Sequence, residues 1–523
     1  MKRLCYLPFL VILTCQAPTG NSEIEQDNFQ FFEISISELQ QGYSQGKYTV
    51  RDVVQAFLIR IEDIDRKGPS LNSILQINSD ALTIADSLDK DLQEGKIRGP
   101  LHGIPVVLKD NIDTHDKMPC TAGSRALRNS YPLKDSYVAD RLRKAGAVII
   151  GKANLSEWAN FRGELSTSGW SGLGGQTKNP YVLDRNPCGS SSGSGVAVSA
   201  NLTVLAIGTE TDGSIVCPSQ ANGIVGIKPT VGLVSRAGVI PISSSQDTPG
   251  PMARTVMDAA ICLGTLVGVD SLDSKTLESV GKYHPDYTVF LHEDGLEGKR
   301  LGIYREALGS NYKVDTLFAE AVEKMKSLGA EVIEIDRLTD EDLGQYELEV
   351  LLYEYKFGLN RYFEELGPGA PIKNLEELIA FNRQDSVELR YFNQQYLEMA
   401  LDKSGLDSDE YRRAKSMLTR GARENGIDRI MDQYRLDAII APTGSPAWKT
   451  DLVNGDSFQL GSSSPSAQAG YPNITVPMGF IGELPVGISF FGRAWSEPIL
   501  IEIAYAFEVN TQHRQAPVFK PTE

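Results

Sequence analysis

Residues 190–228 read SSSGSGVAVSANLTVLAIGTETDGSIVCPSQANGIVGIK. Two turns rich in serine and glycine, GSSSGSG at 189–195 and TDGS at 211–214, flank an apolar run at 196–207. Small residues allow backbone N–H groups to approach a ligand closely, and the serines add hydroxyl groups beside them. The stretch therefore predicts a buried segment whose two ends can present N–H groups and hydroxyls to a substrate.

Patterns typical of strands and of helices alternate along the chain on both sides of this stretch. GIPVVLKD at 103–110 predicts a buried strand, and SYVADRLRKAGAVII at 136–150 predicts a helix that runs into a strand. A further strand–helix–strand unit is predicted over Leu301–Ile335. Such alternation implies a mixed, mostly parallel sheet covered by helices on both faces. We therefore predict an α/β fold in a single large domain.

The segment that precedes the first predicted strand, residues 28–98, has a helical pattern. In TVRDVVQAFLIRIEDIDRKG, residues 49–68, apolar side chains recur on one face. Thr49 with Asp52 resembles a capping box, and Gly68 is a plausible end of this helical stretch.

The predicted domain spans residues 28–516. Its core comprises residues 100–270 and 436–516, because strand patterns return at the end of the chain in LDAIIAPT, NITVPM and PVGISFFG. Residues 337–433 are charged and helical, and we expect them to form a lid or a peripheral insertion. Strand patterns on both sides of the insertion favour one continuous fold.

The first 15 residues have the pattern of a signal peptide. Lys2 and Arg3 precede ten apolar residues, which are too few to cross a bilayer. The run ILTC, ending at Cys15, resembles a bacterial lipoprotein processing site, so Cys15 is expected to carry lipid and residues 16–27 to form a tether. The protein is then expected in the bacterial cell envelope or periplasm, with lipid on Cys15 as its only membrane attachment. The alternative is a frayed N-terminus of a cytosolic enzyme.

Composition excludes several classes of partner. The net charge of −17 argues against binding to nucleic acid or to an anionic membrane surface. The chain has no CxxC and no His/Cys cluster, so no metal site is predicted. The cysteines are too sparse for a disulfide framework, and Cys217, three residues after Ser214, is expected to be small core filling.

Two familiar catalytic or binding motifs fit the serine-rich turn poorly. Residues 189–193 match G-x-S-x-G, but a polar, turn-rich segment precedes them where that motif requires a buried strand. A phosphate-binding loop would end in Gly-Lys-Ser/Thr, which is absent here. None of the five histidines lies in a sequence context that indicates a Ser-His-Asp triad. A glycine-rich turn that packs a helix onto a sheet remains the structural alternative.

A buried lysine can replace histidine as the base. Lysine has a pKa near about 10.4 in water, and burial can lower it to roughly 7–8. Lys109 follows the apolar run 104–108, but Lys152 and Lys228 occupy similar strand ends. The pattern does not choose among the three, and a lone lysine at a strand end is usually a surface residue whose stem is buried.

Three ordered motifs together resemble the amidase signature family of serine hydrolases. They are HGIPVVLKDN at 102–111, CGSSSGSG at 188–195 and GTETDGSIVCPSQANGIVGIKPT at 208–230. The similarity extends over about 29–516. Within the family, VGLVSRAGVIPISSSQDTPGPMART at 231–255 is most similar to the bacterial peptide amidases, which remove the C-terminal amide of peptides.

The resemblance implies a Ser-Ser-Lys triad and an acyl-enzyme mechanism without a cofactor. The implied roles are Lys109 as base, Ser190 as bridging serine held by a cis peptide, Ser214 as nucleophile, and the backbone N–H groups of Thr211, Asp212, Gly213 and Ser214 as oxyanion hole. The implied reaction hydrolyses a primary carboxamide to a carboxylate and ammonia. C-terminally amidated peptides or amino-acid amides are the expected substrates.

The sequence departs from many family members at two positions beside the expected nucleophile. Asp212 stands where glycine is common, and Val216 where arginine is common. Asp212 is expected to be either an ordinary turn residue or a group near a substrate amine. Two other functions stay open: the amidase subunit of an amidotransferase, and a catalytically silent binding lipoprotein. Residues 158–175 and 337–433 are expected to shape the substrate pocket.

Overall fold

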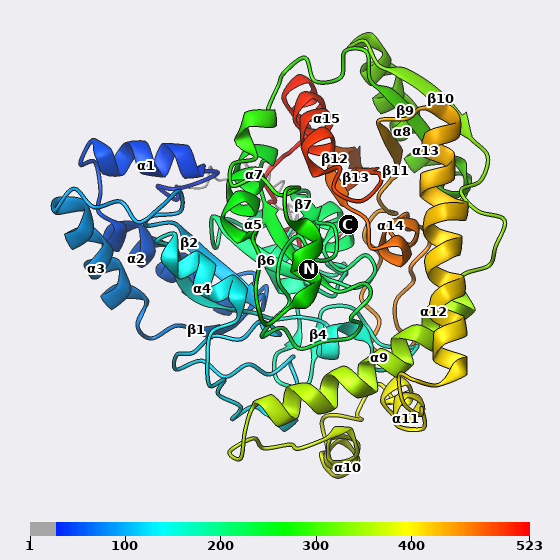
Figure 1. Cartoon of the computed structure of the whole chain (residues 1–523). Helices are drawn as coiled ribbons and strands as arrows, with labels where there is room; N and C mark the ends of the chain where they lie inside the picture. Colours follow the sequence, from blue (N-terminus) through cyan, green and yellow to red (C-terminus); the bar gives the residue numbers. More distant parts are fainter. Residues whose placement is uncertain (1–27, 523) are drawn as a thin grey trace, which may run out of the picture.

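The computed structural model describes residues 28–522 (Figure 1). The expected signal peptide, lipidated Cys15 and tether at 16–27 lie outside these residues. Within them, an 11-stranded sheet forms the centre of the molecule. In sheet order its strands are β1 (Ile74–Ile77), β3 (Val148–Ala153), β2 (Pro105–Lys109), β6 (Leu205–Glu210), β8 (Thr248–Ala253), β7 (Val225–Lys228), β12 (Asn473–Ile481), β13 (Leu484–Phe491), β11 (Ala438–Pro442), β9 (Arg300–Tyr304) and β10 (Glu331–Ile335). A separate two-stranded ribbon pairs β4 (Trp170–Ser171) with β5 (Gly175–Gln176).

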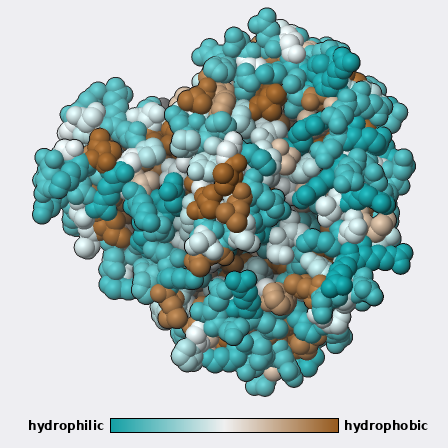
Figure 2. Space-filling model, viewed as in Figure 1, coloured by the Kyte–Doolittle hydropathy of each residue, from teal (hydrophilic) through white to brown (hydrophobic). Residues whose placement is uncertain are grey.

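Helices surround this sheet (Figure 1). The α-helices are α1 (Ile36–Ser44), α2 (Val50–Arg60), α3 (Ala81–Gln93), α4 (Tyr137–Lys144), α5 (Ser192–Ser199), α6 (Val216–Ala221), α7 (Val256–Leu266), α8 (Tyr312–Ser327), α9 (Gly344–Glu365), α10 (Leu375–Gln384), α11 (Gln395–Leu401), α12 (Asp409–Ala422), α13 (Asp428–Tyr434), α14 (Ser464–Ala469) and α15 (Glu497–Thr511). No helix of the described residues is long and apolar enough to span a membrane. The face drawn in Figure 2 is mainly hydrophilic, with separate apolar patches.

The sheet is mixed, as predicted, but its parallel share is smaller than expected. The pairs β2–β3, β2–β6, β9–β10 and β9–β11 are parallel, whereas β1–β3, β6–β8, β7–β8, β7–β12, β12–β13 and β11–β13 are antiparallel. Strand β8 accounts for two of the antiparallel pairs, because it lies between β6 and β7 and is antiparallel to both. The sequence did not predict this strand, because TPGPMA contains two prolines, which normally argue against a central strand.

The central strands are buried on both faces, which confirms a sheet covered by helices. Every residue of β2, β3, β6 and β11 is buried. Helix α5 packs on β2, β3, β6 and β8, while α15 packs on β12 and β13. Strands enclosed in this way have continuous apolar sequences rather than alternating ones. Residues 106–108 of β2 (VVL) and 438–440 of β11 (AII) have this pattern.

The N-terminal helices form largely as their sequence predicts. Asp52 N–H donates to the Thr49 hydroxyl at 3.0 Å, and Thr49 N–H donates to the Asp52 carboxylate at 2.9 Å, so the capping box begins α2. The helix then widens into a π-helical segment, Ile61–Arg66, which ends just before Gly68.

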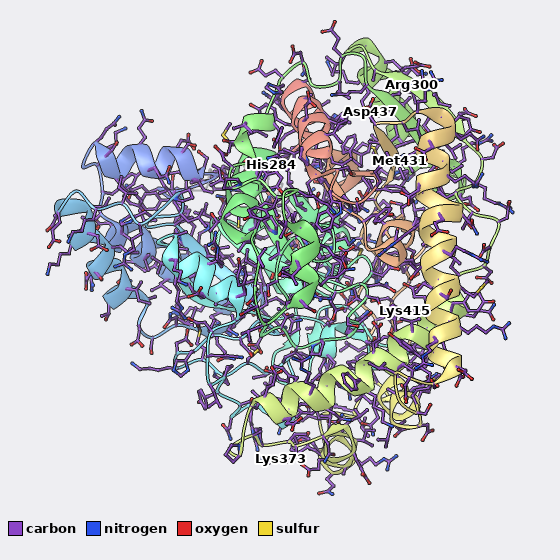
Figure 3. The ribbon with its side chains drawn as sticks, in the orientation of Figure 1. His284, Arg300, Lys373, Lys415, Met431 and Asp437 are labelled. Carbon is purple, nitrogen blue, oxygen red and sulfur yellow. A yellow bond between two sulfur atoms is a disulfide. The ribbon has the colours of Figure 1, made fainter. Side chains whose placement is uncertain are left out.

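Residues 337–433, expected to be a helical insertion or lid, contain α9 to α12, which lie along the lower and right edges of the molecule as drawn in Figure 1. Apolar side chains of α9, α10 and α11 form a second core with residues of the 120–127 and 158–161 segments and with Ile240 and Ile242, whereas those of α12 belong to the main core. An ion pair of 2.7 Å joins Lys415 of α12, labelled in Figure 3, to Glu354 of α9. The insertion thus packs directly against loops that lead to the site described below.

Candidate active site

The two serine-rich turns of the 190–228 stretch meet at one place. Strand β6 ends at Glu210 and leads into the 211–214 turn, where Gly213 has φ +78°, a conformation that favours glycine. The other turn precedes α5 and contains a cis peptide between Gly189 and Ser190. Ser191 N–H donates to the Ser214 carbonyl at 3.2 Å. The predicted proximity of the turns is therefore present in the fold.

Lys109 ends β2 beneath these turns and is fully buried. Its amine nitrogen lies 2.7 Å from the Ser190 hydroxyl oxygen, 3.0 Å from the Thr209 carbonyl and 2.9 Å from the Thr209 hydroxyl. A neutral amine has two N–H donors and one lone pair. It can therefore donate to both Thr209 oxygens and accept the proton of Ser190.

The environment of Lys109 favours this neutral form. Burial lowers the pKa of its amine to about 7, although the negative charges of Asp247 and Glu210 raise it in part. Holding the amine uncharged costs the fold about 5 kcal/mol relative to a solvent-exposed lysine. A group that carries such a cost in the core is a candidate for function.

The structure distinguishes the three strand-end lysines, among which the sequence pattern alone did not choose. Lys109, Lys152 and Lys228 are all fully buried, so none of them is the surface residue that a lone strand-end lysine usually is. Lys152 lies 3.7 Å from the Asp110 carboxylate and donates to the Ile112 carbonyl. Lys228 donates to the Ser466 and Tyr471 carbonyls. Among these three, Lys109 is the lysine bonded to a serine of the 189–195 turn.

The 211–214 turn has a support that the sequence did not predict. The Glu210 carboxylate accepts from the backbone N–H groups of Ile215 and Val216 at 2.7 and 3.0 Å. These bonds fix the two residues that follow Ser214. The sequence feature that could have predicted this support is Glu210 itself, a carboxylate four residues before the candidate nucleophile Ser214.

The N–H groups of the expected oxyanion hole are free to bind a ligand. Among the described residues, no acceptor meets the backbone N–H groups of residues 211–214. The Thr211 hydroxyl donates to the buried Asp247 carboxylate at 2.6 Å. Asp247 also accepts the backbone N–H groups of Ile242 and Ser243, each at 2.8 Å. One side of the turn is thus anchored while its amides stay open.

A cavity of about 480 Å³ opens in front of this turn. Ser214 lines it, with 8% of its surface exposed, whereas Ser190 and Lys109 are fully buried behind the wall. No bond between the Ser190 and Ser214 hydroxyls occurs in the described structure. The remaining lining comes from the 159–168, 188–189, 211–217 and 443–464 segments and from three single residues. The lining residues are Ala159, Asn160, Phe161, Gly163, Glu164, Ser166 and Ser168; Cys188 and Gly189; Thr211, Asp212, Gly213, Val216 and Cys217; Thr443, Trp448, Asp456, Phe458, Gly461, Ser463 and Ser464; and Ile242, Leu351 and Tyr396.

Both segments that were expected to shape the pocket contribute to this wall. Leu351 and Tyr396 come from the helical insertion, and Ala159 and Asn160 come from the 158–175 segment. Trp158, Ala159 and Asn160 have φ of 52°, 54° and 78°, a run of left-handed residues that is rare outside glycine. The C-terminal segment 443–464, which the sequence did not single out, supplies the rest of the rim.

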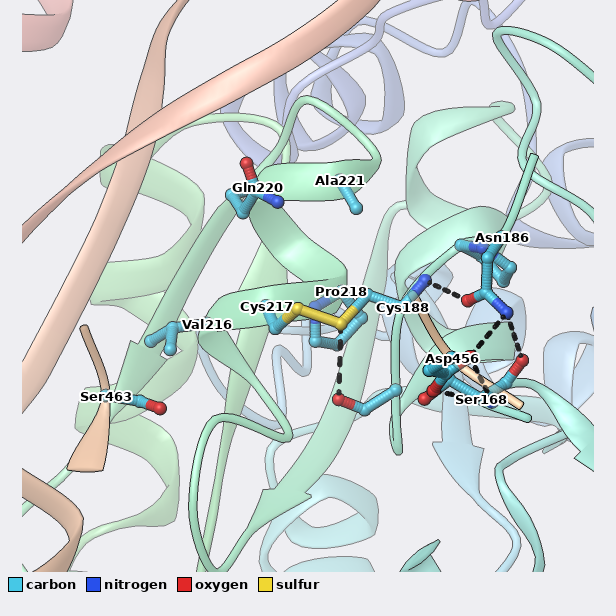
Figure 4. The surroundings of a disulfide bond; sticks show 12 residues. Ser168, Asn186, Cys188, Val216, Cys217, Pro218, Gln220, Ala221, Asp456 and Ser463 are labelled. Atoms are coloured by element: carbon cyan, nitrogen blue, oxygen red, sulfur yellow. Dashed lines mark hydrogen bonds between the residues drawn. A yellow bond between two sulfur atoms is a disulfide. The ribbon is translucent and has the colours of Figure 1, made fainter. Parts of the chain in front are cut away.

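Cys217 is not simple core filling, which corrects the prediction. It forms a disulfide with Cys188, and both residues line the cavity (Figure 4). The bond joins the turn that holds Ser190 to the helix that follows Ser214. Composition did not indicate it, because one pair among sparse cysteines gives no framework signal. Cys120 and Cys262 are free and buried.

The fold and these motifs have known counterparts. A family model described as Amidase matches residues 52–501. The chain belongs to the amidase signature family. It is therefore a hydrolase that acts on amide C–N bonds, as the sequence motifs predicted.

Individual relatives cover nearly the whole chain. The crystal structure of native peptide amidase from Stenotrophomonas maltophilia has 47% identity and a TM-score of 0.89, covering 94% of this chain and 99% of that one. An Arabidopsis thaliana relative named "Probable amidase" is 41% identical over 94% of this chain and 92% of its own length. A glutamyl-tRNA(Gln) amidotransferase subunit of Symbiobacterium thermophilum is 34% identical over 92% of this chain and 98% of its own length.

Proposed function

We propose that this amidase hydrolyses primary carboxamides of C-terminally amidated peptides or amino-acid amides to a carboxylate and ammonia. The observation that carries the proposal is the buried Lys109 amine, 2.7 Å from Ser190, directly behind a cavity lined by Ser214. The likeness to a peptide amidase over nearly the full chain supports this substrate class.

The chemistry begins with activation of Ser214. Neutral Lys109 accepts the Ser190 hydroxyl proton while Ser190 accepts the proton of Ser214, whose oxygen forms a bond to the amide carbon. Negative charge then develops on the carbonyl oxygen, and the backbone N–H groups of residues 211–214 receive it. Each such donor contributes about 3 kcal/mol to the transition state.

The carbon–nitrogen bond breaks in the next step. The proton held by Lys109 returns through Ser190 to the departing nitrogen, which leaves as ammonia, and the acyl group remains on Ser214. Water attacks this ester, giving its proton to the same relay, and the carboxylate is released with Ser214 reprotonated. Every proton is carried by residues of the chain.

Two substitutions test the assignment. Ser214→Ala and Lys109→Ala should each abolish ammonia release from a peptide amide such as N-acetyl-Phe-Gln amide, because each removes a group that takes part in bond formation. Ser327→Ala, on the exposed end of α8, should match the unchanged enzyme. Undiminished ammonia release in the Ser214 variant would falsify the proposed nucleophile. A fluorophosphonate should also label Ser214 and not the Ser214→Ala protein.

Similarity to an amidotransferase subunit favours one second candidate, in which ammonia passes to an acceptor. Hydrolysis by the purified chain without a partner distinguishes the two. Release of free ammonia at full rate supports the hydrolase, whereas turnover that requires a second protein supports the transferase.

We further propose that the protein is exported and anchored by lipid on Cys15. The basic and apolar start of the chain supports export, and a disulfide beside the active site suits an oxidising compartment. Mass spectrometry of the mature N-terminus tests this directly. Lipidated Cys15 at the first position is the expected result, and an intact Met1 in soluble protein would contradict it.

A further inference from the structure

The candidate substrate cavity carries negative charge and no compensating positive side chain. Glu164, Asp212 and Asp456 line it, and no Lys, Arg or His of the described residues does. Glu164 is exposed at the edge of the cavity. The Asp456 carboxylate is engaged by the Ser168 backbone N–H, the Asn186 amide and the Trp448 indole.

Asp212 is the acid of this cavity that lies closest to Ser214 in the sequence, two residues before it. Its two carboxylate oxygens accept the hydroxyls of Ser463 and Ser464 at 2.5 and 2.6 Å. Both serines also line the cavity. Hydroxyl donors hold this carboxylate in place without neutralising its charge, so the field of Asp212 acts on whatever binds beside Ser214.

The charges around Asp212 do not cancel this field. Burial raises the pKa of Glu347 of α9 to about 7, and the negative charge of Asp212 contributes to this shift. Burial also raises the pKa of Glu210, and the negative charge of Asp212 adds to this shift. The cation that faces Asp212 is Lys228, whose amine is fully buried and directed to the Ser466 and Tyr471 carbonyls. The cavity side of Asp212 has no cation among the residues that line it.

We propose that this cavity selects amides by charge, with Asp212 as the specificity-determining residue. It favours substrates that are neutral or positively charged beside the scissile amide and disfavours those with a nearby carboxylate. The proposal rests on the proposed amide hydrolysis. The same repulsion acts on the carboxylate formed by the reaction, so it promotes product release and excludes peptides with a free C-terminus.

An isosteric pair of substrates measures the effect. N-acetyl-Phe-Gln amide and N-acetyl-Phe-Glu amide differ by one charge. Liquid chromatography separates hydrolysis of the C-terminal amide from hydrolysis of the Gln side chain, and for the C-terminal amide we expect kcat/KM to favour the first substrate by about tenfold at low salt, the effect of one charge pair near a protein surface. The preference should fall several-fold in 1 M salt, because screening then acts within about 3 Å. N-acetyl-Phe-Lys amide should be cleaved at least as well as the glutamine substrate.

Asp212→Asn keeps the size of the side chain and its capacity to bond to both serines, but removes the charge. In this variant, the ratio of kcat/KM for the Gln amide to kcat/KM for the Glu amide should fall toward 1. N-acetyl-Phe-Gln with a free C-terminal carboxylate should bind to the variant about tenfold more tightly than to the unaltered enzyme, as measured by calorimetry, which does not require turnover. Glu376→Gln, an exposed residue of α10 that does not line the cavity, changes the net charge equally and should retain the ratio.

The outcomes separate this proposal from the proposed function. Equal kcat/KM for the Gln and Glu amides in the unaltered enzyme, or a preference that 1 M salt leaves intact, overturns charge selection while amide hydrolysis stands. Absence of hydrolysis of every amide overturns the proposed function itself. Should Asp212→Asn fail to fold, the salt dependence of the unaltered enzyme still decides the matter.

Discussion

Removal of the Cys188–Cys217 cross-link should weaken both the fold and the active site. The two cysteines are 29 residues apart, and closing a loop of that length in the unfolded chain corresponds to about 3.6 kcal/mol of stability. The bond also ties the Ser190 turn to the helix after Ser214. We therefore expect Cys188→Ala/Cys217→Ala to lose about 2–4 kcal/mol and a large part of kcat.

Urea unfolding, followed by tryptophan fluorescence, and ammonia release measure the two effects. The unaltered enzyme should lose stability and activity on treatment with a reductant, and the double variant should not respond to it. Cys262→Ala is the matched control, because it removes a buried cysteine that forms no cross-link, and it should keep its response to reductant. Equal stability and full activity in the double variant would refute the reasoning.

Four further predictions concern charged groups. Because burial lowers the pKa of Lys109 to about 7 and the proposed base is its neutral amine, kcat/KM should rise through about pH 7 and level off above it in a pH–rate profile. Between about pH 7 and 10.5 the unfolded chain binds more protons at Lys109 than the folded one, so this residue's contribution to stability, measured by urea unfolding, should rise with pH over that range. Glu210→Gln, which removes the negative charge of the group whose single oxygen accepts both backbone N–H groups, should lower kcat more than it raises KM in steady-state assays. Arg162→Met, which leaves the carboxylates of Glu157 and Glu388 buried without their cation, should cost about 3–5 kcal/mol in urea unfolding, and Glu388→Gln, which keeps one pair, should cost much less.

Strands β2 and β6, which lead into the candidate active site, could be predicted because local sequence determines them. Buried parallel strands such as β2 and β6 require continuous apolar runs, and the chain shows them directly before Lys109 and Glu210. The capping box at Thr49 is equally local. Position in the sequence also limited the candidate base to three lysines, but choosing among them required the three-dimensional contact between Lys109 and Ser190 or a resemblance to a family.

Other features could not be predicted because they depend on distant parts of the chain. Strand β8 contains prolines and becomes a strand through its place between β6 and β7. Nothing in the residues around Cys188 indicates Cys217 as its partner. Likewise, Asp212 was expected to be a turn residue or a group near a substrate amine, and its bonds to Ser463 and Ser464 arise only when the C-terminal segment folds over the turn.

Part of the cavity wall comes from a region of the chain that carries none of the proposed reactive groups. Lys109, Ser190 and Ser214 belong to the sheet and the turns beside it, whereas Leu351 and Tyr396 belong to the inserted helices. A graft of residues 337–433 from a related amidase should therefore exchange the range of accepted side chains and leave the proton relay as it is. Substrate preference and bond-breaking capacity can diverge separately in such chimaeras.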